Sequence, residues 1–183
     1  ENGKPAVEFD GSNDRLRCAT AFSEVNYISA VYENNDTNVY RTILGADATT
    51  TAYGSFYFQS SDNPTRKGGF ARKSATTPAT DYGAVMPSSV SIGTQILQTG
   101  YISGTTIAIS QNGSLQTSTI DTNDLTVIGG QQNGAAEIGA GYYNNSIVDY
   151  SNMKLQEIVV YDSDQSTNRT NIESNINTFY SIY

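Results

Sequence analysis

Apolar and polar residues alternate along most of this chain, in short runs that end at turn-forming residues. In NYISAVYEN (26–34), every second residue falls on the same side, which is the period of a β-strand. Runs of this kind recur down the chain, and we expect strands within 6–11, 14–20, 26–34, 40–47, 54–61, 68–74, 89–103, 105–120, 124–130 and 154–162. Strands at such spacing without helices between them predict an antiparallel sandwich or barrel.

Turn signals divide these runs. Asn112-Gly113, inside 105–120, is a strong signal for a two-residue hairpin turn, because both residues tolerate positive φ. The stretch 76–89 carries two of the four prolines, and we interpret it as a loop. The stretch AGYYNNSIVDY (140–150) is interpreted as a loop as well.

The last segment changes its period from two to that of a helix. Its apolar residues fall on one helical face: Ile172, Ile176, Phe179 and Tyr180. The intervening Asn, Ser, Thr and Glu suit a solvated face, and Asp164 or Ser166 is expected to cap the helix start. We therefore predict one short C-terminal helix that anchors itself against the sandwich.

Composition narrows the classes of function. The chain has 183 residues, which suits a single domain over 1–183. Its net charge is −8 and its Lys and Arg residues are scattered, which argues against a nucleic-acid partner. It has no apolar segment long enough for membrane insertion. The absence of His removes the usual general base and most zinc sites. The lone Cys18 is expected to be a small buried apolar residue.

Four stretches, taken in order, resemble the concanavalin A-like lectin/glucanase superfamily, in its laminin-G-like (LamG) branch. They are VEFDGSNDRLRC near the start, NYISAVYENN with YRTILGAD, the hairpin TTIAISQNGSLQ, and the ending DLTVIGG followed by LQEIVVYDSDQSTNRTNIESNINTFYSIY. Of these four stretches, the ending is the one whose resemblance to the superfamily is the most specific. The polar segment SDQSTNRTNIESNIN within this ending also resembles the ends of such domains in bacteriophage virion proteins.

This resemblance implies an all-β, two-sheet antiparallel jelly-roll sandwich with one short C-terminal helix. It also implies ligands on one sheet face or its rim loops, and chain termini that lie close together. Such a module suits insertion in a larger protein or assembly, at an extracellular or virion surface.

Catalysis is not indicated. Glucanases that share this fold resemble one another in a Glu-x-Asp-x-(x)-Glu strand, and this chain has no such triplet. Retaining glycoside hydrolysis needs two carboxyl groups about 5 Å apart. A lyase that used Tyr57 and Arg72 as base and stabiliser remains a remote alternative. We therefore predict that the chain is not an enzyme.

Aromatic rings and amides are the groups that a sugar site needs, because rings stack on sugar faces and amides bond hydroxyl groups. If Phe56 and Phe58 of SFYFQSS face the core, then Tyr57 and Gln59 face outward, where Arg72 of the next strand could join them. Plain solvated strand positions are the alternative.

The stretch 140–150 offers a second group of such side chains, namely Tyr142, Tyr143 and Asn144. The alternative is that the two tyrosines only cover a sheet edge. Together with Tyr57, Gln59 and Arg72, these residues are our candidate ligand-binding set.

Three oxygen-rich loops are candidates for one structural Ca²⁺, because this hard cation takes carboxylate, carbonyl and amide oxygens. They are ENNDTN (33–38), DGSND (10–14) and DTND (121–124). None has EF-hand spacing, and Asx residues in turns also bond their own backbone. No other cofactor is indicated.

The function predicted from these observations is a non-catalytic carbohydrate-binding or adhesion module for an extracellular or cell-surface polysaccharide. The rival class is a structural or interaction domain of a phage virion, such as a capsid decoration or tail fibre, without glycan binding.

Overall fold

The computed structural model describes residues 2–18, 25–36, 38, 40–46, 56–61, 67–73, 81–104, 106–117, 119–120, 135–143 and 146–183. Most of them form β-strands: β1 (Val7–Asp10), β2 (Leu16–Cys18), β3 (Tyr27–Asn34), β4 (Arg41–Ala46), β5 (Phe56–Ser61), β6 (Lys67–Lys73), β7 (Asp81–Ser89), β8 (Gln95–Ser103), β9 (Thr106–Gln111), β10 (Ser114–Leu115), β11 (Thr119–Ile120), β12 (Ala136–Ile138), β13 (Gly141–Tyr143), β14 (Ser146–Val148) and β15 (Asn152–Tyr161). One helix, α1 (Arg169–Tyr180), follows them.

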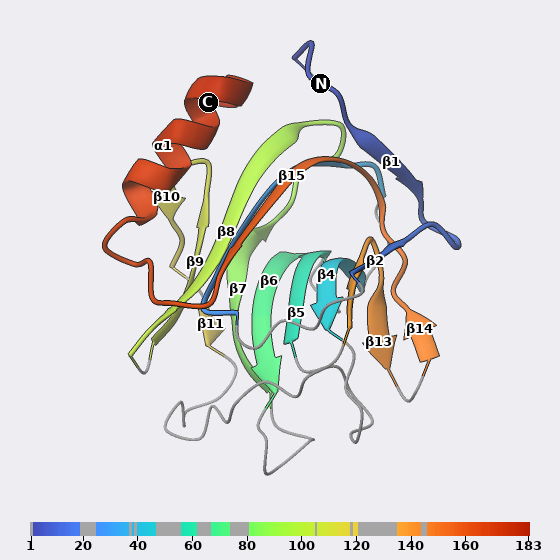
Figure 1. Ribbon diagram of the computed structural model, residues 1–183, viewed down its shortest axis with the longest axis horizontal. Helices are drawn as coiled ribbons and strands as arrows, with labels where there is room; N and C mark the ends of the chain where they lie inside the picture. The colour runs from blue at the N-terminus through green and yellow to red at the C-terminus, as the bar shows by residue number, and fades with distance from the viewer. Residues whose placement is uncertain are drawn as a thin grey trace.

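The strands form two antiparallel sheets and a separate hairpin (Figure 1). The six-stranded sheet has the order β1-β15-β3-β8-β9-β10, and the seven-stranded sheet has the order β11-β7-β6-β5-β4-β12-β2. The hairpin pairs β13 with β14. Consecutive strands often lie in different sheets, as in a jelly roll, so the predicted all-β sandwich with a C-terminal helix is confirmed.

Two segments interpreted as loops contain strands. The stretch 76–89 includes β7, so the loop interpretation is wrong for 81–89, whereas 76–80 lie outside the described residues. Pro87 is tolerated there because the pairing of β6 with β7 shifts register between Lys67 and Gly69, and Pro87 falls in the irregular part. The stretch 140–150 includes the hairpin β13–β14. The expected strand 124–130 lies outside the described residues.

The turn at Asn112-Gly113 is as predicted. Both residues have positive φ, 49° and 78°, and the turn joins β9 to β10.

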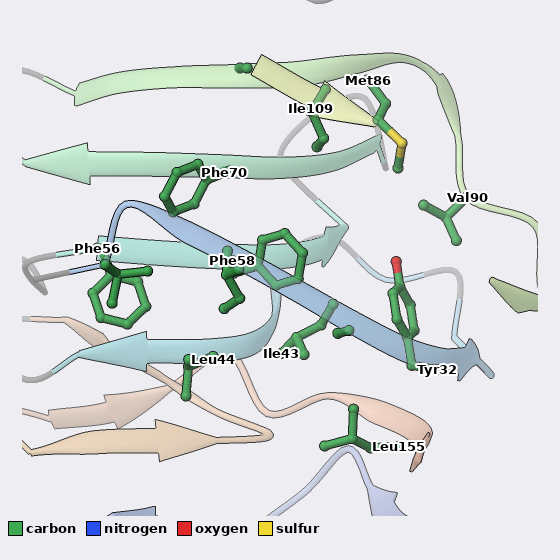
Figure 2. Packing of buried hydrophobic residues seen from close by; sticks show 14 of the residues in the cluster. Tyr32, Ile43, Leu44, Phe56, Phe58, Phe70, Met86, Val90, Ile109 and Leu155 are labelled. Carbon is green, nitrogen blue, oxygen red and sulfur yellow. The ribbon is translucent and has the colours of Figure 1, made fainter. Parts of the chain in front are cut away.

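The hydrophobic core lies between the two sheets, which both contribute large side chains (Figure 2). Phe56 and Phe58 of β5 are fully buried, as the alternation of that strand predicts. All eight residues of β3 are buried, because α1 covers the face of β3 that is turned away from the core. Burial on both faces agrees with the mostly apolar sequence of β3, YISAVYEN.

A buried amide connects the two sheets. Gln98 of β8 is fully buried, accepts a hydrogen bond from the Tyr32 hydroxyl at 2.6 Å, and donates to the backbone carbonyl of Gln59 at 2.9 Å. Since a buried amide without partners would be costly, these bonds favour one relative position of β8 and β5.

Helix α1 packs on the outer face of the six-stranded sheet. Ile176 and Tyr180 form a small cluster with Val31 and Leu97, and Ile172 packs against it, so the predicted anchoring is confirmed. Phe179 is the exception, because its side chain is 56% exposed. Ile172, Ile176 and Tyr180, at positions i, i+4 and i+8, make the contact with the sheet. Phe179 precedes Tyr180 by one residue, so its side chain is rotated about 100° around the helix axis from that line.

The start of α1 also differs from expectation. Its N-cap is Asn168, not Asp164 or Ser166, and Asn168 makes no side-chain cap bond. Asp164 instead accepts a bond from the backbone N–H of Ser166 at 2.8 Å, in the turn that precedes the helix. Asp164 therefore stabilises the turn into α1 and not its first N–H groups.

The two ends of the chain lie together, as the resemblance implies. The side-chain amide of Asn2 donates to the carbonyls of Tyr180 at 2.9 Å and Ser181 at 3.1 Å. In the described part of the chain, no helix has the length and apolar character that a membrane crossing requires.

Candidate functional site

Tyr57 and Gln59 lie on the outer face of the seven-stranded sheet, opposite to the core side chains of β5. Both are half-buried. The register places Gly45 of β4 and Ala71 of β6 beside Tyr57, and Gly69 of β6 beside Gln59. On β4, Thr42 is beside Gln59. Tyr57 and Gln59 are therefore larger than the neighbours that the register gives them on this face.

The hairpin β13–β14 crosses this face next to Tyr57. A Cβ atom on Gly45 would lie 3.3 Å from the carbonyl oxygen of Ala140 and from the Cα of Gly141, so the hairpin approaches β4 closely because both residues 45 and 141 are glycine. The Tyr57 hydroxyl donates to the carbonyl of Tyr142 at 2.7 Å. Two of the candidate residues, distant in sequence, are thus joined directly.

The other candidates are not placed with this pair. The register sets Arg72 opposite Phe56, whereas Tyr57 is set opposite Ala71, so the backbone position of Arg72 belongs to the same face as Phe56. The side chains of Arg72 and Tyr143, and all of Asn144, lie outside the described residues.

A buried carboxylate that the sequence did not single out lies in the same row as Tyr57. Glu137 of β12 pairs with Gly45 on one side and Arg17 on the other. Its side chain is fully buried, and it accepts from Arg15 and Arg17, each at 2.7 Å. Two cations on one carboxylate use both of its oxygens, so Glu137 fastens β12 to β2.

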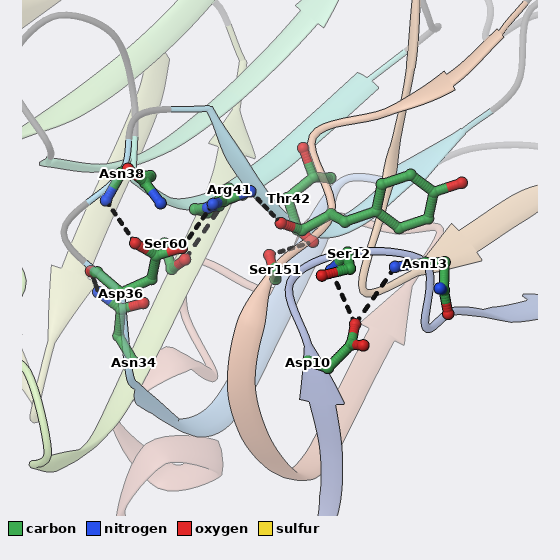
Figure 3. Close-up of polar contacts among 11 residues, drawn as sticks. Asp10, Ser12, Asn13, Asn34, Asp36, Asn38, Arg41, Thr42, Ser60 and Ser151 are labelled. Carbon is green, nitrogen blue, oxygen red and sulfur yellow. Dashed lines mark hydrogen bonds and ion pairs between the residues drawn. The ribbon is translucent and has the colours of Figure 1, made fainter.

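A second polar cluster lies at the start of β4 (Figure 3). Arg41 forms an ion pair with Asp36 at 2.5 Å and donates to the carbonyl of Tyr150. Burial opposes the charge of Asp36, but bonds from Asn38 and the charge of Arg41 outweigh it and lower the pKa of Asp36. Arg41 thereby connects the loop after β3 to the segment that precedes β15.

Three buried polar atoms of this cluster have no hydrogen-bond partner within the described part of the chain: Asn34 Oδ1, Arg41 Nε and Thr42 Oγ1. The backbone around them is well bonded. Thr42 N–H donates to the carbonyl of Asp149 at 3.1 Å, and the Ser151 hydroxyl donates to the carbonyl of Thr42 at 2.8 Å.

The candidate calcium loops use their oxygens in local bonds. Asp10 Oδ1 accepts from the N–H groups of Ser12 at 2.7 Å and Asn13 at 3.2 Å, and these bonds lower the pKa of Asp10 (Figure 3). In 33–38, Asp36 accepts from Asn38 N–H at 2.7 Å. The loop 121–124 lies outside the described residues. Among the residues that are described, no group of three acidic, His or Cys side chains could hold a metal ion.

The buried carboxylates in the described ranges have cationic partners. Besides Glu137, Glu33 pairs with Lys154 at 3.0 Å and Glu173 pairs with Arg169 at 2.5 Å. Each of these three glutamates is less than 10% exposed. These carboxylates are therefore suited to structural ion pairs.

Cys18 is half-buried and packs against the core. Burial, together with the charge of Glu137, raises the pKa of its thiol. The thiol form is therefore favoured at neutral pH, in agreement with an apolar packing role.

Comparisons with known proteins show the fold. No protein-family model matches the sequence. No curated protein matches it either. The heptameric SAP-like pentraxin of Limulus polyphemus is a structural neighbour, with a TM-score of 0.63 and 13% identity, over 93% of this chain and 81% of the pentraxin chain.

Two further neighbours are modules of bacterial enzymes. The CBM40 of the Ruminococcus gnavus IT-sialidase, bound to α2,3 sialyllactose, has a TM-score of 0.65 and 12% identity, over 91% of this chain and 94% of that chain. Domain 4 of the Geobacillus stearothermophilus arabinanase AbnA, in complex with arabinotriose, has a TM-score of 0.62 and 11% identity, over 92% and 76%. At such identities the likeness establishes the architecture alone, and this chain has a jelly-roll fold.

Proposed function

We propose that this chain is a non-catalytic carbohydrate-binding module whose site lies on the outer face of the seven-stranded sheet, beside the hairpin β13–β14. The observation that carries the proposal is the 2.7 Å bond between the Tyr57 hydroxyl and the Tyr142 carbonyl. It brings two segments that carry Tyr, Asn and Gln to one face of the sheet.

The chemistry of this face supports a neutral or weakly charged glycan. Tyr rings present apolar planes that stack on sugars, and their hydroxyl groups and the Gln59 amide can bond sugar hydroxyls. Tyr143 and Asn144 remain proposed members of the site, whereas the register sets Arg72 in line with Phe56, on the other face of the sheet. The fold neighbours bound to sialyllactose and arabinotriose show that this architecture accommodates sugar ligands in other proteins.

The test is a glycan array followed by calorimetric titration of the strongest glycan. We expect saturable binding by the wild-type protein and a loss of about fivefold or more in affinity for Tyr142→Ala and Gln59→Ala, because each substitution removes a stacking or hydrogen-bonding group of about 1 kcal/mol or more. Phe179→Ala, which removes an exposed aromatic ring from α1, is the matched control.

Tyr57 needs two variants, because its hydroxyl also positions the hairpin. Tyr57→Phe keeps the ring and removes the bond to Tyr142, whereas Tyr57→Ala removes both. If Tyr57 stacks on the ligand, Tyr57→Ala weakens binding more than Tyr57→Phe. Equal binding by all variants, or silence of the wild-type protein across the array, would favour a structural or interaction role.

A further inference from the structure

A groove lies between α1 and β15, on the outer face of the six-stranded sheet. Its volume is about 510 Å³, which falls within the range of roughly 300–1,000 Å³ that small-molecule sites occupy. Figure 1 shows α1 and the hairpin β13–β14 at opposite sides of the molecule, so this groove is separate from the site proposed above.

The floor of the groove is apolar and fixed. Val159, Ile172 and Ile176 line it, and all three belong to the cluster that anchors α1 to the sheet. Because the floor is part of this packing, the groove is a built feature of the fold and does not depend on a flexible loop.

One wall of the groove is a row of amides. Asn168, Asn171 and Asn175 recur at three- and four-residue spacing, which places them on one side of the helical segment, and all three line the groove. Within the described part of the chain, the side chains of Asn171 and Asn175 have no hydrogen-bond partner. They therefore offer donors and acceptors toward the open space.

The turn that precedes α1 also contributes amide side chains to the groove. Gln165 lines it and accepts a bond from the Asn168 side chain at 2.9 Å. This bond orients Asn168, so that its side-chain carbonyl is available to a ligand.

The opposite wall contributes an aromatic ring and one carboxylate. Tyr161 is 38% exposed and packs edge-on against buried Tyr27, with ring centroids 5.7 Å apart and an interplanar angle of 75°. This contact holds the Tyr161 ring in place while part of it remains open to solvent. Glu157 is the one charged residue that lines the groove within the described ranges.

These groups select a class of ligand. Among the described residues, no Lys or Arg lines the groove, and Glu157 repels anions, so phosphate, sulfate and carboxylate ligands are disfavoured. A polyhydroxylated neutral molecule with apolar ring faces matches an apolar floor, a Tyr ring, several amides and a single acceptor carboxylate. We infer that the groove between α1 and β15 is a second binding site, for a neutral saccharide.

The inference is tested by NMR titration of the whole ¹⁵N-labelled chain. Cellotriose and arabinotriose serve as neutral probes, and 3′-sialyllactose serves as the anionic contrast. We expect a neutral trisaccharide to shift the side-chain amide signals of Asn171 and Asn175 saturably, and sialyllactose to shift them much less. If neither neutral probe moves these signals at millimolar concentration, or if sialyllactose moves them equally, the inference is wrong.

Variants separate this site from the one on the other sheet. The double variant Asn171→Ala and Asn175→Ala should weaken binding of the neutral probe at the groove about tenfold. Ala favours helix, so the variant should fold. Thr170→Ala with Ser174→Ala, at the same spacing on exposed positions outside the groove, is the matched control and should bind as the wild type does.

The two proposals can fail independently. Tyr142→Ala should leave the groove signals responsive, because that residue lies on the other sheet face. Loss of the groove response in Tyr142→Ala, or in the Thr170 and Ser174 control, would contradict a separate saccharide site. Retained affinity in the Asn171 and Asn175 variant would contradict it as well.

Discussion

At Asp149, the backbone has a φ of 56°, and the carboxyl group lies beneath the hairpin near Gly141. Burial raises the pKa of Asp149 from 3.8 to about 6, although the charge of Arg41 opposes this change. Because the folded state binds this proton more tightly than the unfolded state, the contribution of Asp149 to stability is fully present below pH 3.8. It is lost as the pH rises through about 6.

Asp149→Asn should therefore stabilise the protein at pH 7.5, by roughly 1–2 kcal/mol after allowance for solvent screening. Asn also tolerates positive φ. At pH 4 the variant and the wild type should have nearly equal free energies of unfolding, measured by urea denaturation at both pH values. Asp162→Asn, at an exposed position, is the control and should change stability by no more than about 0.5 kcal/mol at either pH. A destabilised Asp149→Asn at pH 7.5 would show that the charged carboxylate is favourable there.

At the scale of secondary-structure elements, the local sequence pattern of α1 predicts which residues contact the sheet, but it does not predict the burial of Glu173. The apolar spacing predicts its contact line, which depends only on residues within the helix. Glu173 was expected on the solvated face but is 1% exposed, because it pairs with Arg169 and accepts from the hydroxyl of Ser110. Ser110 is 63 positions away, so no local pattern reveals the bond.

Glu173→Ala should destabilise the protein by about 3–5 kcal/mol, because Arg169 loses its buried anionic partner and Ser110 is left with an unsatisfied hydroxyl. Thermal and chemical denaturation measure the loss. Ser174→Ala, the next residue on the exposed side, should remain within about 0.5 kcal/mol of the wild type. A small effect for Glu173→Ala would mean that water replaces the buried ion pair without cost.

At the scale of the whole molecule, Gly100 is a position where the two sheets approach each other closely. Gly100 of β8 faces Phe70 of β6, and a Cβ atom at residue 100 would lie 2.6 Å from Phe70 Cβ and Cγ. The ring thus packs directly on the backbone of the other sheet. Since interiors are close-packed, a single added methyl group must move one sheet or the other.

Gly100→Ala should lower the free energy of unfolding by about 1–3 kcal/mol through this overpacking. The second substitution Phe70→Leu creates space at the contact, so the double variant should be less destabilised than the sum of the two single variants. Urea denaturation of the four proteins gives the coupling energy. Strict additivity would show that the strain at residue 100 is not exerted through Phe70.

The sequence by itself determined the strand class, the core face of β5, the turn at Asn112-Gly113 and the anchoring line of α1. Each depends on the period of a local run or on the backbone preference of one or two residues, so neighbouring residues contain the information. It missed β7, because two prolines outweighed the inward positions of Ala84 and Met86. Only the tertiary structure decided that Tyr57 meets Tyr142, that Arg72 is in register with Phe56, and that amides of α1 face Tyr161 across a groove. These relations depend on sheet register and on the packing of segments far apart in the chain, which local periodicity does not specify.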